Sequence, residues 1–193
     1  EITNILKSED VLNTIDAFKK MGVNIESKSN KIIIKGKGLS SLIKPKNDIY
    51  LGNSGTSARL LIGLLSNQNF ETNLTGDKSL SSRPMKRIIE PLKSMGANIS
   101  SNNGNLPINI KGKNLKKIKY EIPVPSAQVK SGIILAALNT EGESEIIENT
   151  ITRDHTEIML KSFGADINII RENESKIIKI KGKKELESKN IVI

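Results

Sequence analysis

The chain has 193 residues and a formal net charge of +9; 36% of its residues are hydrophobic and only 3% are aromatic. It contains no cysteine, which excludes disulfides, thiolate metal sites and a cysteine nucleophile, and its single histidine, His155, excludes a histidine-based metal cluster. No apolar run approaches the roughly 20 residues that cross a bilayer, and no secretory signal opens the chain, so we expect a cytoplasmic protein without a membrane span.

The first elements belong to an incomplete structural unit. Residues 1–5 are predicted to form a strand and residues 8–21 a helix, which Gly22 ends. Two strands follow, and the second of them finishes at the sequence IKGK, residues 34–37.

The second unit is complete, and it shows the order strand, helix, strand, helix, strand, strand. Pro84 is expected at the first position of the second helix, where a missing backbone N–H costs nothing. A hairpin closes the unit. The predicted ranges are, in order, residues 49–51, 56–66, 71–74, 84–95, 98–100 and 107–111.

The third unit repeats this order, and a final strand is predicted at residues 190–193. Asp154 and Glu157 have the spacing of a capping box at the start of the last helix. A turn at residues 172–174 is expected to join the last two strands. The predicted ranges of the unit are, in order, residues 120–124, 128–138, 143–147, 154–163, 167–171 and 176–181.

Two markers recur along the chain. A helix-ending glycine stands at positions 22, 96 and 164, and the sequence IKGK stands at 34–37, 110–113 and 180–183. Matched spacing of two independent markers predicts three copies of a βαβαββ unit about a pseudo-threefold axis, an α+β (α/β) fold in a single domain of residues 1–193. The first copy lacks its first strand and helix, so we expect a fragment whose first sheet has an open edge.

The turns that precede the helices carry groups able to bind anions. Residues 51–56 (LGNSGT) link a strand to a helix whose free N–H groups can hold a phosphate or carboxylate, and Arg59 adds a positive charge near the first turn. Residues 124–131 are the counterpart in the third unit, and Arg83 and Arg153 stand where the second helices begin. About a threefold axis these four helix starts converge on one face. The alternative is a set of ordinary helix caps with solvated arginines.

Arginine supports the anion-binding interpretation more than the overall charge does. The lysines are spread along the chain and few aromatic side chains can stack on bases, which disfavours nucleic-acid binding. In a chain whose usual cation is lysine, an arginine is expected where its planar fork is needed. The five arginines are Arg59, Arg83, Arg87, Arg153 and Arg171.

Four motifs, in this order, resemble those of the 5-enolpyruvylshikimate-3-phosphate synthases, in their bacterial form. They are LGNSGT at residues 51–56, GDKSLSSRPM at 76–85, PSAQVKS at 125–131 and TRDHTE at 152–157. The resemblance implies an enolpyruvyl transferase-like fold, an inside-out α/β barrel with three βαβαββ units in each of two domains. It also implies transfer of the enolpyruvyl group of phosphoenolpyruvate to the 5-hydroxyl of shikimate 3-phosphate, with release of phosphate.

This reaction belongs to the shikimate pathway, which leads to chorismate and the aromatic amino acids. In the family it proceeds through a tetrahedral intermediate in a cleft between the domains, without a metal or organic cofactor, and glyphosate occupies the phosphoenolpyruvate site. The family's Lys-Ser-x-x-x-Arg motif and its second domain, which carries the acid and base carboxylates, are absent from this sequence. The resemblance therefore implies an N-terminal domain that binds both substrates, has no catalytic residue of its own and needs a C-terminal domain for turnover.

The resemblance also assigns binding residues. Asn53 and Thr56 shape the first turn. Gly55, Arg83 and Gln128 are expected at phosphoenolpyruvate, and Ser126, Ala127, Gln128 and Arg153 at shikimate 3-phosphate, with Arg153 on its phosphate.

Three alternatives stay open at this point. UDP-N-acetylglucosamine enolpyruvyl transferase shares the fold and chemistry, but its usual cysteine is absent here. A basic nucleic-acid-binding module is the second, because RNA 3′-phosphate cyclases have a related architecture. The third is a structural domain that keeps only the fold, against which the retained motif residues argue.

Overall fold

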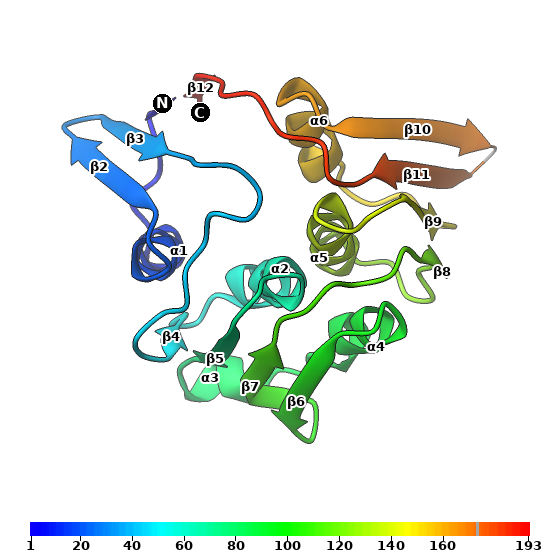
Figure 1. Cartoon of the computed structure of the whole chain (residues 1–193), viewed down its shortest axis with the longest axis horizontal. Helices are drawn as coiled ribbons and strands as arrows, with labels where there is room; N and C mark the ends of the chain where they lie inside the picture. The colour runs from blue at the N-terminus through cyan, green and yellow to red at the C-terminus, as the bar shows by residue number, and fades with distance from the viewer. Residues whose placement is uncertain (173) are drawn as a thin grey trace.

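The computed structural model describes residues 1–172 and 174–193, and it confirms the predicted three-unit α/β fold. Three four-stranded sheets form an outer layer around two central helices, α2 and α5 (Figure 1). Asn173, in the predicted turn of the third unit, lies outside the described residues. Within the described ranges, no helix has the length and apolar character that crossing a membrane requires.

The helices and strands follow the predicted order, and most of their ends are shifted by one or two residues. The first unit contains β1 (Ile2–Thr3), α1 (Glu9–Lys20), β2 (Asn24–Lys28) and β3 (Lys31–Lys35). The second contains β4 (Ile49–Tyr50), α2 (Gly55–Ser66), β5 (Glu71–Thr75), α3 (Lys78–Ser81), α4 (Lys86–Ser94), β6 (Asn98–Asn102) and β7 (Asn105–Lys111). The third contains β8 (Lys119–Glu121), α5 (Ala127–Leu138), β9 (Glu143–Glu148), α6 (His155–Ser162), β10 (Asp166–Glu172) and β11 (Ser175–Lys181), and β12 (Ile191–Val192) ends the chain.

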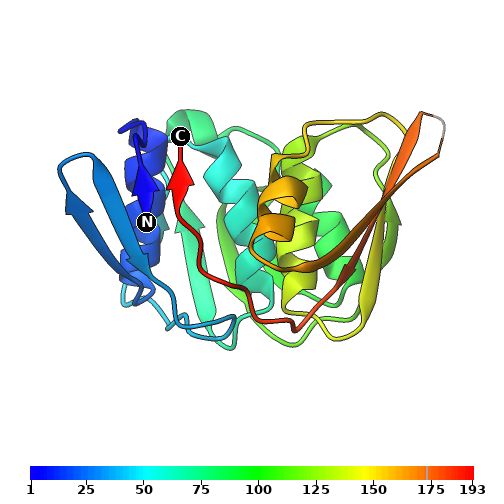
Figure 2. The ribbon, with the colours of Figure 1, turned by 90° about the horizontal axis from the view of Figure 1, so that it is seen from above.

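The expectation that the first sheet has an open edge at β1 is wrong, because β12 pairs with β1 there. The sheet has the order β12-β1-β3-β2, and β12 pairs in parallel with β1 through Ile2↔Ile191 and Thr3↔Val192. The second and third sheets have the same arrangement, β4-β5-β7-β6 and β8-β9-β11-β10. The last strand therefore occupies the first position of the first unit, and the two ends of the chain lie side by side (Figure 2).

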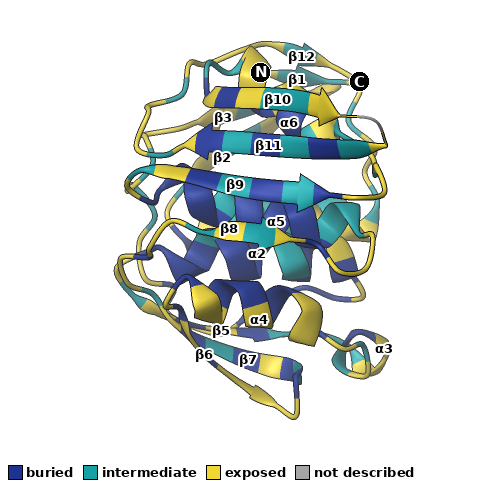
Figure 3. Cartoon of the chain, turned by 90° about the vertical axis from the view of Figure 1, so that its right-hand side faces the viewer, coloured by how far each residue is buried: buried dark blue, intermediate teal, exposed yellow. Residues whose placement is uncertain are grey.

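The two central helices are buried on nearly all sides, as helices with apolar residues around their whole circumference must be. They lie behind the sheet of the third unit in Figure 3. They are in close contact at Gly63 and Gly132, where a Cβ added to Gly63 would lie 1.9 Å from the carbonyl oxygen of Gly132. Each begins at a serine N-cap, Ser54 or Ser126, whose hydroxyl accepts a hydrogen bond from a backbone N–H of the first turn.

Among the described residues, the first unit contains one helix, α1, and the other two units contain more. The repeated IKGK sequence is therefore buried to a different extent in the first unit. Ile110 and Ile180 are fully buried, whereas Ile34 is 44% exposed. The glycines that follow at positions 112 and 182 pack against the carboxyl ends of α2 and α5, while a Cβ on Gly36 would meet nothing within 4 Å. The matched positions of the first unit are therefore packed differently from those of the second and third units.

Two expectations at helix starts are corrected. The second helix of the second unit begins at Lys86 rather than at Pro84, and the unpredicted α3 precedes it. The cause is local: the Asp77 carboxylate caps α3 by accepting a hydrogen bond from Leu80 N at 2.6 Å, and Met85 N donates to the hairpin carbonyl of Gly104 at 2.7 Å. Arg83 therefore lies in the link between α3 and α4.

The predicted capping box of α6 is also wrong. The side chain of Asp154 makes no capping hydrogen bond, and its carboxylate lies 3.7 Å from the guanidinium of Arg171. Glu157 is buried and binds two lysines instead. A glutamate near a helix start can serve either purpose, and here long-range partners decide.

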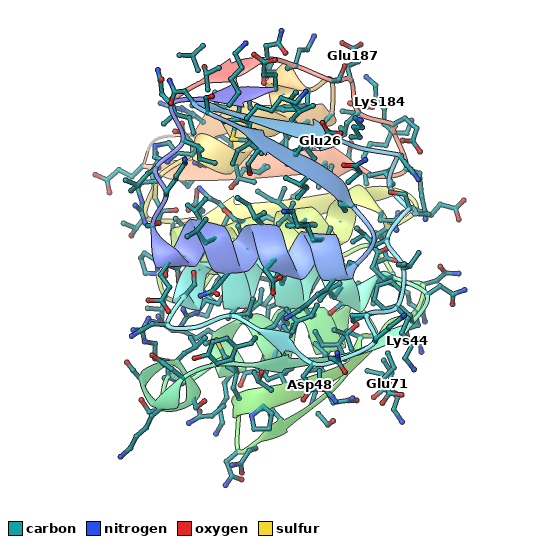
Figure 4. The ribbon with its side chains drawn as sticks, turned by 90° about the vertical axis from the view of Figure 1, so that its left-hand side faces the viewer. Glu26, Lys44, Asp48, Glu71, Lys184 and Glu187 are labelled. Carbon is teal, nitrogen blue, oxygen red and sulfur yellow. The ribbon has the colours of Figure 1, made fainter. Side chains whose placement is uncertain are left out.

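Acidic and basic side chains share the face that contains α1. Figure 4 labels six of them. Glu26 on β2, for example, forms an ion pair with Lys35 on β3 at 2.6 Å. This surface pair holds the pKa of Glu26 below its usual value, through the hydrogen bond from Lys35 and its charge. Exposed pairs of this kind contribute little to stability.

Ser54→Ala is expected to lower the free energy of unfolding by about 1 kcal/mol, because the buried Ser54 hydroxyl caps α2 and also hydrogen-bonds to the Ser57 hydroxyl at 2.8 Å. Ser8→Ala is the matched control, since Ser8 occupies the N-cap of α1 without a side-chain capping bond. Urea denaturation of both variants measures the difference. Equal losses would show that the Ser54 hydroxyl has no special role.

Candidate functional site

The N-termini of α2 and α5 open on the same end of the molecule. The Gln128 amide donates to the Thr56 hydroxyl at 2.8 Å where the helices begin, and the Asn139 amide donates to the carbonyl of Asn67 at 3.1 Å where they end. The two helices are therefore parallel. Their free N–H groups and the positive ends of their dipoles point to one region.

Arg59 connects the helix starts in this region. Its guanidinium donates to the side-chain oxygen of Gln128 at 2.9 Å, to the carbonyl of Gly55 at 3.2 Å and to the carbonyl of Pro84 at 3.2 Å. It thus connects α2, α5 and the link before α4. The sequence placed Arg59 near the first turn of α2 but did not include it among the substrate-binding residues.

Arg83 reaches the same region from the link between α3 and α4. Its guanidinium donates to the side-chain oxygen of Asn53 and, at 3.5 Å, to the hydroxyl of Ser79. A Cβ on Gly55 would lie 3.0 Å from a guanidinium nitrogen of both Arg59 and Arg83. Glycine at position 55 therefore leaves room between two arginine side chains.

The charge of this cluster is positive, and the groups around it decide whether that charge is neutralised. Among the described residues, no carboxylate lies within ion-pairing distance of Arg59, Arg83 or Arg87. Burial lowers the pKa of Arg59, and the charges of Arg83 and Arg87 lower it further. An arginine stays protonated even so, which leaves a partly buried positive cluster beside two helix N-termini. Such an arrangement favours a bound carboxylate or phosphate.

The structure gathers most of the site residues that the sequence predicted. The cluster contains Asn53, Gly55, Thr56, Arg83 and Gln128. Ser126 caps α5, and Ala127 is its first helical residue, so both lie next to Gln128.

Arg153 is connected to this region through its backbone rather than its side chain. The carbonyl of Arg153 accepts a hydrogen bond from the Lys130 ammonium at 2.8 Å, and Lys130 belongs to α5. The side chain of Arg153 is exposed. Within the described ranges, no group of three or more histidine or acidic side chains is arranged to bind a metal ion.

The fold is that of an α/β protein with outer sheets and inner helices, and the arginine cluster at its helix N-termini, which no described carboxylate neutralises, has the chemistry that suits an anion. The model of the family described as EPSP synthase (3-phosphoshikimate 1-carboxyvinyltransferase) matches residues 1–193. The chain therefore belongs to the EPSP synthase family, the family of the 5-enolpyruvylshikimate-3-phosphate synthases.

Individual relatives agree with this assignment. The 3-phosphoshikimate 1-carboxyvinyltransferase of Caldicellulosiruptor saccharolyticus is 54% identical over 176 residues, which is 90% of this chain and 40% of the relative. That of Streptococcus agalactiae is 49% identical over 98% of this chain and 44% of the relative. A solved structure of EPSP synthase from Acinetobacter baumannii superposes with a TM-score of 0.92 at 47% identity, over 100% of this chain and 43% of that one.

The comparisons confirm the family that the four motifs indicated, and its members are transferases. They do not favour the UDP-N-acetylglucosamine enolpyruvyl transferase or the nucleic-acid-binding module. The chain spans less than half the length of the curated relatives it matches.

Proposed function

We propose that this chain is the N-terminal domain, residues 1–193, of a 5-enolpyruvylshikimate-3-phosphate synthase. It supplies half of the site in which the enolpyruvyl group of phosphoenolpyruvate passes to the 5-hydroxyl of shikimate 3-phosphate, with release of phosphate. The observation that carries this proposal is the cluster of Arg59, Arg83 and Arg87 at the N-termini of α2 and α5, for which the described part of the chain offers no acidic partner. Both substrates are anions, and guanidinium groups beside helix N-termini bind anions.

Phosphoenolpyruvate is assigned to the centre of the cluster. The backbone N–H of Gly55 is one of the free donors at the start of α2, and the guanidinium of Arg83 faces the same space. Gln128 lies between Thr56 and Arg59, so its amide is held at the border of the two assigned substrates. Bidentate arginine contacts and helix N–H groups fix the orientation of the ligand as well as its charge.

Shikimate 3-phosphate is assigned to the start of α5 and to the segment before α6. Ser126, Ala127 and Gln128 are the residues at the helix start, and Arg153 supplies the guanidinium for the phosphate. The contribution of this chain to the reaction is binding and orientation, which lower the entropic cost of bringing two substrates together. The proton transfers are assigned to carboxylates of a C-terminal domain, and the proposal places the enzyme in the cytoplasm.

Calorimetric titration of this chain with shikimate 3-phosphate tests the proposal. Arg153→Ala and Gln128→Ala are each expected to weaken binding by at least about tenfold, because a hydrogen bond to a charged group contributes about 1.5–3 kcal/mol. Lys161→Ala is the control, since it removes a positive charge from the exposed last turn of α6 without altering the assigned site. Equal effects of all three variants would contradict a specific site.

A further inference from the structure

Four charged side chains form a closed ring in the interior of the third unit. Lys130 on α5, Glu148 at the end of β9, Glu157 on α6 and Lys176 on β11 are each at most 2% exposed. One oxygen of Glu148 lies 3.0 Å from Lys130 Nζ and 2.9 Å from Lys176 Nζ. One oxygen of Glu157 lies 2.8 Å and 3.0 Å from the same two nitrogens. Positive and negative charges alternate, and the ring is neutral.

The ring occupies positions that face the core. Glu148 and Lys176 are cross-strand partners, and each continues a row of inward-facing residues on its strand, with Ile146 on β9 and Ile178 on β11. Burial of four charges carries a large desolvation cost, which the mutual attraction offsets only in good geometry. A core of this fold would ordinarily place apolar residues here.

The second unit does place apolar residues here. Equivalent positions in the two units can be found by counting from shared features. Lys130 and Ala58 are each the fourth residue after the serine that caps their helix, and the other positions are counted back from the helix-ending glycines and from the glycines of the IKGK sequences. The counterparts of Lys130, Glu157 and Lys176 are the buried residues Ala58, Ile89 and Leu106. The second unit therefore folds without these charges, and of these two units only the third contains the ring.

Within the part of the chain that the structure describes, two side-chain hydrogen bonds leave the ring, and both go to one segment. The third N–H of the Lys130 ammonium donates to the carbonyl of Arg153 at 2.8 Å, and the hydroxyl of Thr152 donates to the second oxygen of Glu148. Residues 149–154, which join β9 to α6, contain no helix or strand. In the second unit, the corresponding connection contains α3, with its own cap at Asp77.

We propose that this buried ring is a positioning device that fixes the backbone of Thr152 and Arg153 against the start of α5. Lys130 and Glu148 are the anchoring members, and Glu157 and Lys176 complete the neutral ring. The ring thereby sets the position of the Arg153 guanidinium relative to Ser126 and Gln128. The ligand part of this inference, a phosphate ester held between these elements, rests on the proposed function; the positioning part does not.

Two matched double variants separate positioning from mere packing. Lys130→Met/Glu148→Leu removes both anchors and leaves the pair Lys176–Glu157, 3.0 Å apart. Lys176→Met/Glu157→Leu removes no anchor and leaves the pair Lys130–Glu148, also 3.0 Å apart. Each variant replaces one buried cation and one buried anion by apolar side chains of similar size, so a purely structural role predicts equal behaviour.

The first readout is backbone dynamics. NMR order parameters of Thr152 and Arg153 are expected to stay near the rigid value of about 0.85 in the variant that keeps the anchors and to fall below about 0.6 in the variant that lacks them. Equal order parameters in the two variants would overturn the inference. Thr152→Val removes one anchoring bond without changing the charge of the ring. Its order parameters serve as the test if the Lys130→Met/Glu148→Leu variant does not fold. Unchanged order parameters in Thr152→Val would also overturn the inference.

The second readout is the affinity for shikimate 3-phosphate. It is expected to fall at least about tenfold when the anchors are lost and to change less than about twofold when they are kept. Binding that is equal in both variants would overturn the link between the ring and the site. If the unaltered chain does not bind this ligand, the proposed function fails for this chain, while the order parameters still decide whether the ring positions the segment.

Discussion

Glu157→Leu is expected to lower the free energy of unfolding by about 3–5 kcal/mol, one of the two largest effects we predict for this chain. Glu157 accepts from both buried lysines, at 2.8 and 3.0 Å, and the variant leaves one positive charge of the ring without a counterion. Adding Lys176→Met restores neutrality, so the double variant is expected to be more stable than the single one. Urea denaturation of the wild type, both single variants and the double variant measures the coupling between the two positions. Strictly additive losses would contradict the ring.

The same ring predicts how the stability of the fold changes with pH. Burial alone would raise the pKa of Glu148, but the hydrogen bonds from Thr152, Lys176 and Lys130 outweigh it and hold the pKa below its usual value. A carboxylate with a lowered folded pKa stabilises the fold fully above its unfolded pKa, about 4.3, and this contribution is lost as pH falls through the folded value. Burial likewise opposes the charge of Lys176, yet Glu148 and Glu157 raise its pKa, so that contribution is lost only in strongly alkaline solution.

Gly112→Ala and Gly182→Ala are expected to destabilise the chain by about 1–3 kcal/mol or more, whereas Gly36→Ala changes stability by less than about 0.5 kcal/mol. An added Cβ would lie 2.0 Å from the carbonyl oxygen of Gln68 at position 112 and 1.9 Å from that of Thr140 at position 182. Both oxygens belong to the backbone at the ends of the central helices, which cannot move without disturbing the core.

Gly36 is the internal control for this prediction, because it occupies the same place in the repeat and its added Cβ would meet nothing within 4 Å. None of the three glycines has a positive φ, so the comparison isolates steric contact from backbone strain. Urea denaturation of the three variants measures the differences. A similar loss at position 36 would show that the first unit is packed like the other two.

The repeat made most of the fold predictable from the sequence. Glycine markers and the IKGK sequence depend on local turns and on strand ends, which short stretches of sequence specify. The pairing of β12 with β1 could not be predicted in this way, because it joins residues at opposite ends of the chain. The short α3 was also missed, since its cap, Asp77, has the appearance of a turn residue.

The candidate site was predictable in its residue types but not in its connections. Helix-start motifs brought Gly55, Arg83 and Gln128 into the predicted site, because capping turns and free helix N–H groups are local features of a sequence. Arg59 was underestimated, since its hydrogen bonds go to the link before α4, at Pro84, and across to the third unit, at Gln128. Glu157 fitted a local capping pattern, and only the folded chain brings Lys130 and Lys176 to it.

The most direct test of the central claim is NMR mapping of the amide signals of this chain during addition of shikimate 3-phosphate, followed by phosphoenolpyruvate. The account predicts that the first ligand shifts Ser126, Ala127, Gln128 and Arg153, and that the second adds shifts at Gly55 and Arg83. Shifts spread over the exposed lysines, or confined to another face of a folded chain, would contradict the assignment of both substrates to the N-termini of α2 and α5.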